Sequence, residues 1–178
     1  APHTIFKNTY KLEPGHFLTI NKKGDIKNIE YWNLEFFYNK GYNEKKLWDK
    51  KNEIEVEKEL SSILIEGFKL RMVADVPIGI FLSGGIDSSL LIALLQNNTT
   101  TPLNTFTVGF SEKEYNEAHF AKKVSTHLGT HHTEIHCTPY EVVDLLSDLY
   151  SHLDEPFGDS SLIPTYLISK MARTKVKV

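Results

Sequence analysis

The sequence has a single cysteine, Cys137, so no disulfide bond can form within the chain, and a reducing, cytoplasmic setting is the simplest fit. No apolar run approaches the roughly 18 residues that a membrane-spanning helix needs. The first residues, APHTIFKNTYKLEPG, lack the apolar core of a secretion signal. Basic residues are not in excess, since 20 Lys and Arg stand against 23 Asp and Glu. The net charge of −3 argues against a general nucleic-acid binder.

The 178 residues are 40% hydrophobic and 24% charged, which is typical of globular domains. Residues 1–38 predict short antiparallel strands at 10–12, 17–20 and 29–32, separated by the turns EPG and NKKGD. Residues 39–56 are polar and predict a linker. Position 1 is alanine, and the final KVKV alternates like the beginning of a strand. We therefore expect a piece of a longer protein, with a sheet left incomplete at the C-terminus.

Residues 57–178 alternate between helical and strand-like patterns. The segment IGIFL is wholly apolar, as expected of a strand buried on both faces of a parallel sheet. The patterns predict strands at 78–82, 104–110, 132–137 and in KVKV, and helices at 56–71, 87–96, 116–129, 139–153 and 161–173. This order predicts an α/β fold, an open parallel sheet with helices on both faces.

The segment SGGIDS, at 83–88, joins the apolar strand to the next helix. In such sheets ligands bind at the carboxyl ends of the strands, and a helix N-terminus offers unpaired N–H groups to an anion. Gly84 and Gly85 allow the backbone to approach a ligand closely, and Ser83 and Ser88 can donate hydroxyl hydrogen bonds. These features predict a site for nucleotide phosphates, with simple helix capping as the alternative.

Asp87 is unusual beside a phosphate site, because carboxylate and phosphate repel each other unless a cation joins them. Mg²⁺ binds both kinds of oxygen together, so Asp87 predicts Mg²⁺ at this site. No lysine follows as in the Walker pattern GxxxxGK[ST], and there is no GxGxxG. The loop is therefore expected to hold phosphates in a way different from either of those two motifs.

SGGIDSS resembles the pyrophosphate loop of the N-type ATP pyrophosphatases. The longer segment DVPIGIFLSGGIDSSLL is similar to the synthetase domain of the glutamine-dependent asparagine synthetases, PP-loop ATPases with an adenine nucleotide alpha hydrolase-like fold. TFTVGF, NEAHFAKKVSTHLGTHH and LDEPFGDSSLIPTYLISKMAR match that family in the same order. The N-terminal TIFKNTYKLEPGHFL is similar to the last strands of its glutaminase domain. Residues 1–38 are therefore expected to be a remnant of that domain, and 57–178 the N-terminal part of the synthetase domain.

The resemblance also implies roles for particular residues. Those expected to hold pyrophosphate are Ser83, Gly84, Gly85, Asp87 and Ser88, with Asp87 acting through Mg²⁺. Leu82 and Val108 would flank the adenosine with backbone contacts, although both residues also suit a buried core. Four acidic residues match the family and are expected near the substrate or Mg²⁺, with helix capping as the alternative: Glu117, Asp154, Glu155 and Asp159.

Members of the family adenylate aspartate with ATP, release pyrophosphate, and then use ammonia from glutamine to form asparagine and AMP. The resemblance therefore implies small-molecule partners (ATP, aspartate or another carboxylate, and ammonia from glutamine), with no nucleic acid and no membrane. A homodimer is considered for the full-length protein. Two family features are missing, since Ala1 stands in place of a cysteine nucleophile and no SGDGGDE loop follows the last strand. The chain alone is expected to bind ATP weakly at most.

Other functions stay open. A non-catalytic nucleotide-binding module, or a related PP-loop amidotransferase acting on another carboxylate, would carry the same loop. A tRNA-modifying enzyme would also carry it, but the acidic balance and residues 1–38 argue against that function.

Two further signals favour structural roles. The histidine-rich segment HLGTHHTEIH, at 127–136, lacks the cysteine or carboxylate pattern of a zinc site, and its end reads as a strand. Cys137 has no evident base partner, so a small buried apolar residue is a better interpretation than a nucleophile.

Overall fold

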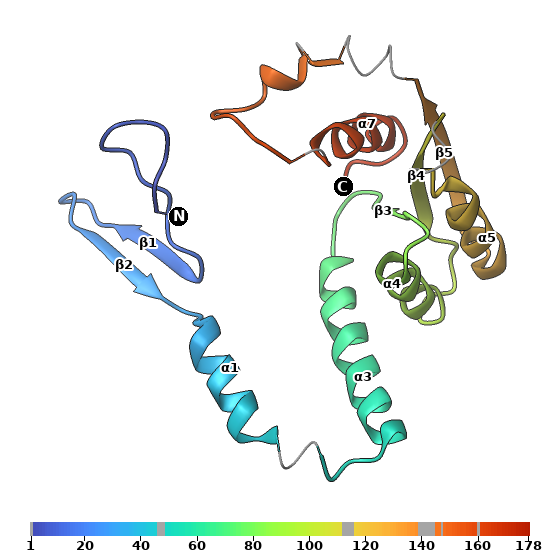
Figure 1. Ribbon diagram of the computed structural model, residues 1–178, viewed down its shortest axis with the longest axis horizontal. Helices are drawn as coiled ribbons and strands as arrows, with labels where there is room; N and C mark the ends of the chain where they lie inside the picture. Colours follow the sequence, from blue (N-terminus) through green and yellow to red (C-terminus); the bar gives the residue numbers. More distant parts are fainter. Residues whose placement is uncertain (1, 46–48, 112–115, 139–144, 147, 160) are drawn as a thin grey trace. The chain divides into compact units, whose positions relative to one another are not determined.

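The computed structural model describes residues 2–45, 49–111, 116–138, 145–146, 148–159 and 161–178. The chain divides into two compact units, Ala1–Val56 and Glu57–Val178, whose elements are drawn in Figure 1. Across the described ranges, no helix combines the length and the apolar character that crossing a membrane requires.

The first unit contains an antiparallel hairpin and one helix. β1 (His16–Ile20) pairs with β2 (Ile26–Glu30), so that His16 lies opposite Glu30. The predicted NKKGD turn joins the two strands, with the Asn21 side chain accepting the N–H groups of Lys23 and Asp25 at 2.9 and 3.0 Å. The strand predicted at 10–12 is wrong, because that part of the described chain forms only a bridge between His3 and Tyr10.

α1 (Leu34–Asn43) is a helix where the sequence predicted the end of the β-rich segment 1–38 and the start of the linker 39–56. Gly41 and the asparagines within the segment disfavour a helix, which is why the pattern did not indicate one. The start of α1 is stabilised by Asn33, whose side chain accepts the Phe36 N–H at 2.8 Å. None of the described side chains of this first unit is buried.

The second unit is an α/β layer structure, as predicted. The strands β3 (Gly79–Phe81), β4 (Asn104–Phe110) and β5 (His131–Cys137) form a parallel sheet in the order β3–β4–β5. Its helices are α3 (Glu53–Arg71), α4 (Ile86–Gln96), α5 (Ala118–Leu128) and α7 (Leu162–Ala172). Of the predicted helix 139–153, residues 139–144 and 147 lie outside the described residues, and 145–146 and 148–150 are helical.

Helices cover both faces of the sheet. Phe81 pairs with Phe106 on the neighbouring strand, so their side chains lie on the same face of the sheet. Side chains alternate between faces along a strand, so the Leu82 side chain lies on the opposite face. Leu82 belongs to a buried cluster formed with α4 and α5 (Leu82, Ile92, Leu95, Leu103 and Ala121). Phe106 packs on the other face against Ala172 and Val176. Accordingly, α5 and α7 lie on either side of β4 (Figure 1).

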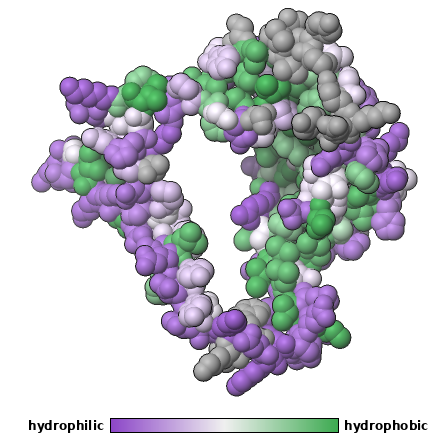
Figure 2. Space-filling model, viewed as in Figure 1, coloured by the Kyte–Doolittle hydropathy of each residue, from purple (hydrophilic) through white to green (hydrophobic). Residues whose placement is uncertain are grey.

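α3 forms the predicted helix but leaves much of its apolar stripe exposed. Leu60 and Ile63 are 52% and 58% exposed, and apolar residues are visible on the surface of this helix (Figure 2). Only its C-terminal end reaches the core, where Phe68 and Met72 pack against the Leu82 cluster.

The last residues of the chain lie along the other edge of β3. The Gly79 N–H donates to the Val178 C=O at 2.7 Å, and the Val178 N–H donates to the Pro77 C=O at 3.4 Å. This is the pattern of a parallel pair, in which one residue bonds to both neighbours of its partner. Residues 177 and 178 therefore lie beside β3, on the side opposite β4. The described part of 175–178 is not a regular strand, so the strand predicted in KVKV is represented only by these backbone bonds, and β3 is the edge strand of the three-stranded sheet. Open sheets of this class bind ligands at the carboxyl ends of their strands.

Candidate functional site

The segment that joins β3 to α4 lies at the carboxyl end of β3. Leu82 follows β3, is 1% exposed, and donates its N–H to the Phe106 C=O at 2.8 Å. Gly85 then caps α4 without any side-chain hydrogen bond. The first-turn N–H groups of α4 therefore have no capping side chain, and the positive end of the helix dipole adds to their attraction for an anion.

Gly84 holds this segment close to α5. Its φ of +86° lies in the left-handed region that favours glycine. A Cβ atom placed on Gly84 would lie 2.7 Å from the Ala121 backbone nitrogen and 3.1 Å from the Glu117 carbonyl oxygen. The absence of a side chain at Gly84 therefore lets the loop rest directly on the first turn of α5.

Ser83 and Ser88 bond to each other across the loop. Their hydroxyl oxygens lie 3.0 Å apart, and the Ser88 hydroxyl also accepts the Ser83 N–H at 3.3 Å. The Ser83 hydroxyl in turn accepts the Gly85 N–H at 3.2 Å. The two predicted hydroxyl donors thus shape the turn in this structure, and a phosphate would have to draw on the same hydroxyl protons.

Asp87 lies in the first turn of α4 and is exposed. A carboxylate in this position also stabilises the helix through its dipole, which is the capping alternative. Among the residues that the structure describes, no three His, Cys, Asp or Glu side chains are grouped closely enough to bind a metal. Within the loop between β3 and the first turn of α4, Asp87 is the carboxylate that could hold a cation together with phosphate oxygens.

A hollow of about 250 Å³ opens beside the loop. It brings together four of the predicted site residues: Leu82, Ser83, Val108 and Glu117. The remaining lining residues come from β3, β4 and α7, namely Phe81, Thr107, Phe110, Pro164, Thr165 and Ile168. The hollow is therefore bounded by β3, β4, the start of α5 and the start of α7, which are far apart in the sequence.

Val108 lies on β4 just past the end of β3 and is one of the residues that line the hollow. In a strand, alternate residues turn their N–H and C=O groups to the same side, and the Phe106 C=O faces β3 by accepting the Leu82 N–H. The N–H and C=O groups of Val108 are therefore expected to point to the same side two residues later. The described backbone hydrogen bonds include none from Val108 to the segment that follows β3.

The acidic residues of the 154–159 loop do not line the hollow. Asp159 accepts the Ser161 N–H at 2.8 Å, just before α7, and this bond holds the pKa of the Asp159 carboxyl below its usual range. This is a local turn bond to the residue that precedes α7 and not a cap of the helix, because the start of α7 has no side-chain cap. Asp154 and Glu155 lie earlier in the same loop and do not line the hollow.

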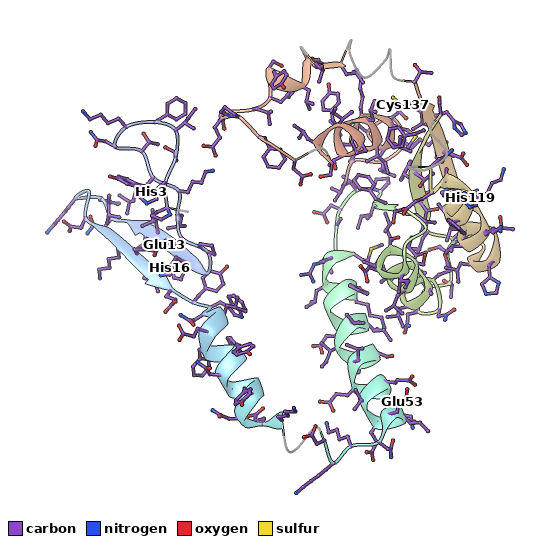
Figure 3. The ribbon with its side chains drawn as sticks, viewed as in Figure 1. His3, Glu13, His16, Glu53, His119 and Cys137 are labelled. Carbon is purple, nitrogen blue, oxygen red and sulfur yellow. The ribbon has the colours of Figure 1, made fainter. Side chains whose placement is uncertain are left out.

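The histidines of the predicted strand have structural contacts. The His132 Nδ1 lies 2.9 Å from the buried Thr105 hydroxyl, and burial lowers the pKa of His132 below its usual range. His136 pairs with Glu134 at 2.8 Å. Cys137 lies at the end of β5 and is 3% exposed (Figure 3). The burial of Cys137 fits its interpretation as a small apolar residue.

Sequence reasoning missed Thr107 and the residues of α7 at the hollow. Thr107 is 2% exposed, and its hydroxyl donates to the Leu82 C=O. The sequence marks Thr107 only as a polar residue just before the apolar end of a predicted strand. Pro164, Thr165 and Ile168 gave no signal, because the packing of α7 over β4 is a tertiary feature.

The sequence is similar to those of one family of known proteins. Residues 59–178 match the profile of the asparagine synthase family. The chain is 39% identical over its whole length to a protein named putative asparagine synthetase (glutamine-hydrolyzing) 2 from Methanocaldococcus jannaschii, of which it covers 33%. Over 99% of its length it is 32% identical to asparagine synthetase (glutamine-hydrolyzing) 1 from Bacillus subtilis, of which it covers 26%.

A further relative carries a different name. The chain is 30% identical, over 88% of its length, to amidase chyE from Penicillium rubens, of which it covers 24%. The chain thus spans a third or less of the length of each of these three proteins.

Proposed function

The chain belongs to the asparagine synthase family, and on that premise we propose that it carries the ATP-binding half of an ATP-dependent, glutamine-hydrolysing asparagine synthetase. The observation that carries this proposal is the β3–α4 turn. At Gly84 the turn lies in close contact with α5, and no side chain caps the N–H groups at the start of α4. A hollow lined by Leu82 and Val108 lies beside the turn. The phosphates of a nucleotide would lie on the turn and its base in the hollow.

The proposed reaction explains why binding groups gather at the turn. The side-chain carboxylate of aspartate attacks the α-phosphate of ATP, so that an acyl-adenylate forms and pyrophosphate leaves. Ammonia from glutamine then attacks the acyl carbon and displaces AMP, giving asparagine. Negative charge grows on the leaving pyrophosphate, where the N–H groups at the start of α4 stabilise it.

The base would be recognised by backbone groups. Adenine presents a hydrogen-bond donor and an acceptor side by side on one edge, and Val108 presents an acceptor and a donor to the hollow. The Leu82 side chain is buried in the core, so any contact from Leu82 comes from its backbone. Glu117, which is exposed at the rim of the same hollow, would face the ribose or the acyl acceptor.

Asp87 fits Mg²⁺ as a bridging ion. Mg²⁺ in nucleotide sites is usually held by one or two carboxylates together with phosphate oxygens and water, so one carboxylate beside the turn is sufficient. Asp87 would hold the ion, which when bound neutralises charge on the phosphates. The capping alternative predicts no effect of Asp87 on nucleotide affinity.

Calorimetric titration of the chain with Mg·ATP tests the proposal. We expect measurable binding to the wild type and about tenfold or more weaker binding to Asp87→Asn, because a charge-assisted contact is lost. Asp75→Asn is the matched control, since it removes the same charge from an exposed residue at the opposite end of β3. Equal affinity of the Asp87 and Asp75 variants would remove Asp87 from the site, and no binding to the wild type would overturn the proposal.

The carboxylate that receives the amide is proposed to be aspartate. A relative named amidase chyE shares 30% identity, so another acceptor is the second candidate. Pyrophosphate release by the complete parent protein, measured with aspartate and with other carboxylates in the presence of ammonia, distinguishes the two. Small-molecule substrates and a cytoplasmic location are proposed with the same function.

A further inference from the structure

The hydroxyl of Thr107 takes a position in the sheet that a backbone group normally occupies. Thr107 lies on β4, is 2% exposed, and donates its hydroxyl hydrogen to the Leu82 C=O. The Leu82 N–H meanwhile donates to the Phe106 C=O at 2.8 Å. Leu82 is therefore held on both of its backbone polar groups, one by a backbone partner and one by a side chain.

In a regular parallel ladder the second partner would be different. A residue that donates to Phe106 accepts from the residue two positions further along, which is Val108. The described backbone hydrogen bonds around Leu82 include none from the Val108 N–H to the Leu82 C=O. The Thr107 hydroxyl thus satisfies a carbonyl that the Val108 N–H would otherwise reach, and the ladder between β3 and β4 stops one bond early.

We propose that Thr107 is a positioning residue that keeps the Val108 N–H available to the edge of a purine base. This inference rests on the proposed nucleotide-binding function and adds a residue to it. By bonding the Leu82 C=O, Thr107 leaves the Val108 N–H facing the hollow that both residues line. Without the hydroxyl, the buried Leu82 C=O would draw the Val108 N–H into the ladder, because buried carbonyls are nearly always paired.

Thr105 provides a matched comparison on the same strand and the same face. It is 0% exposed, and its hydroxyl bonds to Thr130 at 2.8 Å and to the His132 ring at 2.9 Å. These contacts join β4 to β5 and lie away from the hollow, whose lining does not include Thr105. Both threonines fill the interior, but only Thr107 touches the strand end that precedes the phosphate turn.

The test compares Thr107→Val, Thr107→Ser and Thr105→Val with the wild type. Valine preserves the shape and removes the hydroxyl, whereas serine keeps the hydroxyl. In Thr107→Val we expect Val108 amide hydrogen exchange, followed by NMR, to slow by about tenfold, and Mg·ATP affinity to fall by about three- to tenfold, the equivalent of one neutral hydrogen bond. Thr107→Ser and Thr105→Val should keep the wild-type exchange rate at Val108 and the wild-type affinity.

Inorganic pyrophosphate with Mg²⁺ separates positioning from general damage. It would occupy the turn without reaching Val108, so its affinity should be unchanged in Thr107→Val. An equal loss of ATP and pyrophosphate affinity, or an equal effect of Thr105→Val, would overturn the inference. If the wild type binds no ATP, the proposed function fails, and the exchange rate at Val108 still tests the role of Thr107 by itself: an unchanged rate in Thr107→Val rejects it.

Discussion

Replacement of Gly84 by alanine tests the central feature of the phosphate turn. Alanine at a φ of +86° costs about 1–2 kcal/mol, because its Cβ crowds the backbone in the left-handed region. The added Cβ would also lie 2.7 Å from the Ala121 backbone nitrogen, which cannot move without shifting α5. Overpacking of this kind costs about 1–3 kcal/mol. The expected destabilisation of Gly84→Ala is therefore about 2–5 kcal/mol, or roughly 8–20 °C in Tm.

Gly129→Ala separates the two contributions. Gly129 ends α5 with a φ of +71°, and a Cβ atom there would meet nothing within 4 Å. It belongs to the same unit as Gly84, so one calorimetric melting transition reports on both variants. Only the conformational cost remains at Gly129, about 1–2 kcal/mol or roughly 4–8 °C. If Gly84→Ala lowers Tm no more than Gly129→Ala does, the close contact between the turn and α5 is refuted.

Two further substitutions test the packing and the charges of the second unit. Gly79→Ala would place a Cβ against the Phe106 ring and 2.9 Å from Val176 Cγ2. We expect its free energy of unfolding, measured by urea denaturation, to fall by about 1–3 kcal/mol. An unchanged denaturation midpoint would contradict the packing of the Phe106 cluster. The Tyr166 hydroxyl donates to Asp148 and holds the pKa of that carboxyl below its usual range. Tyr166→Phe should therefore be less stable than the wild type near pH 7. The stability difference between the two proteins should shrink below about pH 4 and disappear once the pH has fallen through the lowered pKa of Asp148. A stability difference that does not depend on pH would exclude this bond as its cause.

The parallel sheet and the position of its glycine-containing loop could be predicted from the sequence. IGIFL is a short apolar run of the kind expected of a strand covered on both faces, TFTVGF has a strand-like pattern, and both form strands of the sheet. The glycines and the helix start after IGIFL predicted an anion-binding turn, and Gly84 has the positive φ expected of such a turn. Local patterns were sufficient here because local chain chemistry determines each of these features.

Other features depend on contacts between distant segments, which periodicity does not contain. The apolar periodicity of residues 56–71 predicted the helix α3, but it does not say what covers the stripe, and Leu60 and Ile63 are largely exposed. Conversely, Gly41 hid α1 from the pattern, although the Asn33 cap stabilises it. The role of Asp159 was equally open in the sequence, and its bond to the Ser161 N–H appears only once the start of α7 is known.

The candidate site consists of backbone groups that regular structure would have paired. α4 starts at Gly85 without a side-chain cap, and β4 continues past the end of β3, so N–H groups remain available at both places. The buried clusters around Leu82 and Phe106 hold β3 and β4 in register, so these N–H groups keep their positions. A ligand that bonds to the N–H groups at both places should bind more tightly than one that bonds only to those at the start of α4. Ligand binding raises Tm according to the ligand's own Kd, so at equal concentrations Mg·ATP should raise the Tm of the second unit more than pyrophosphate does.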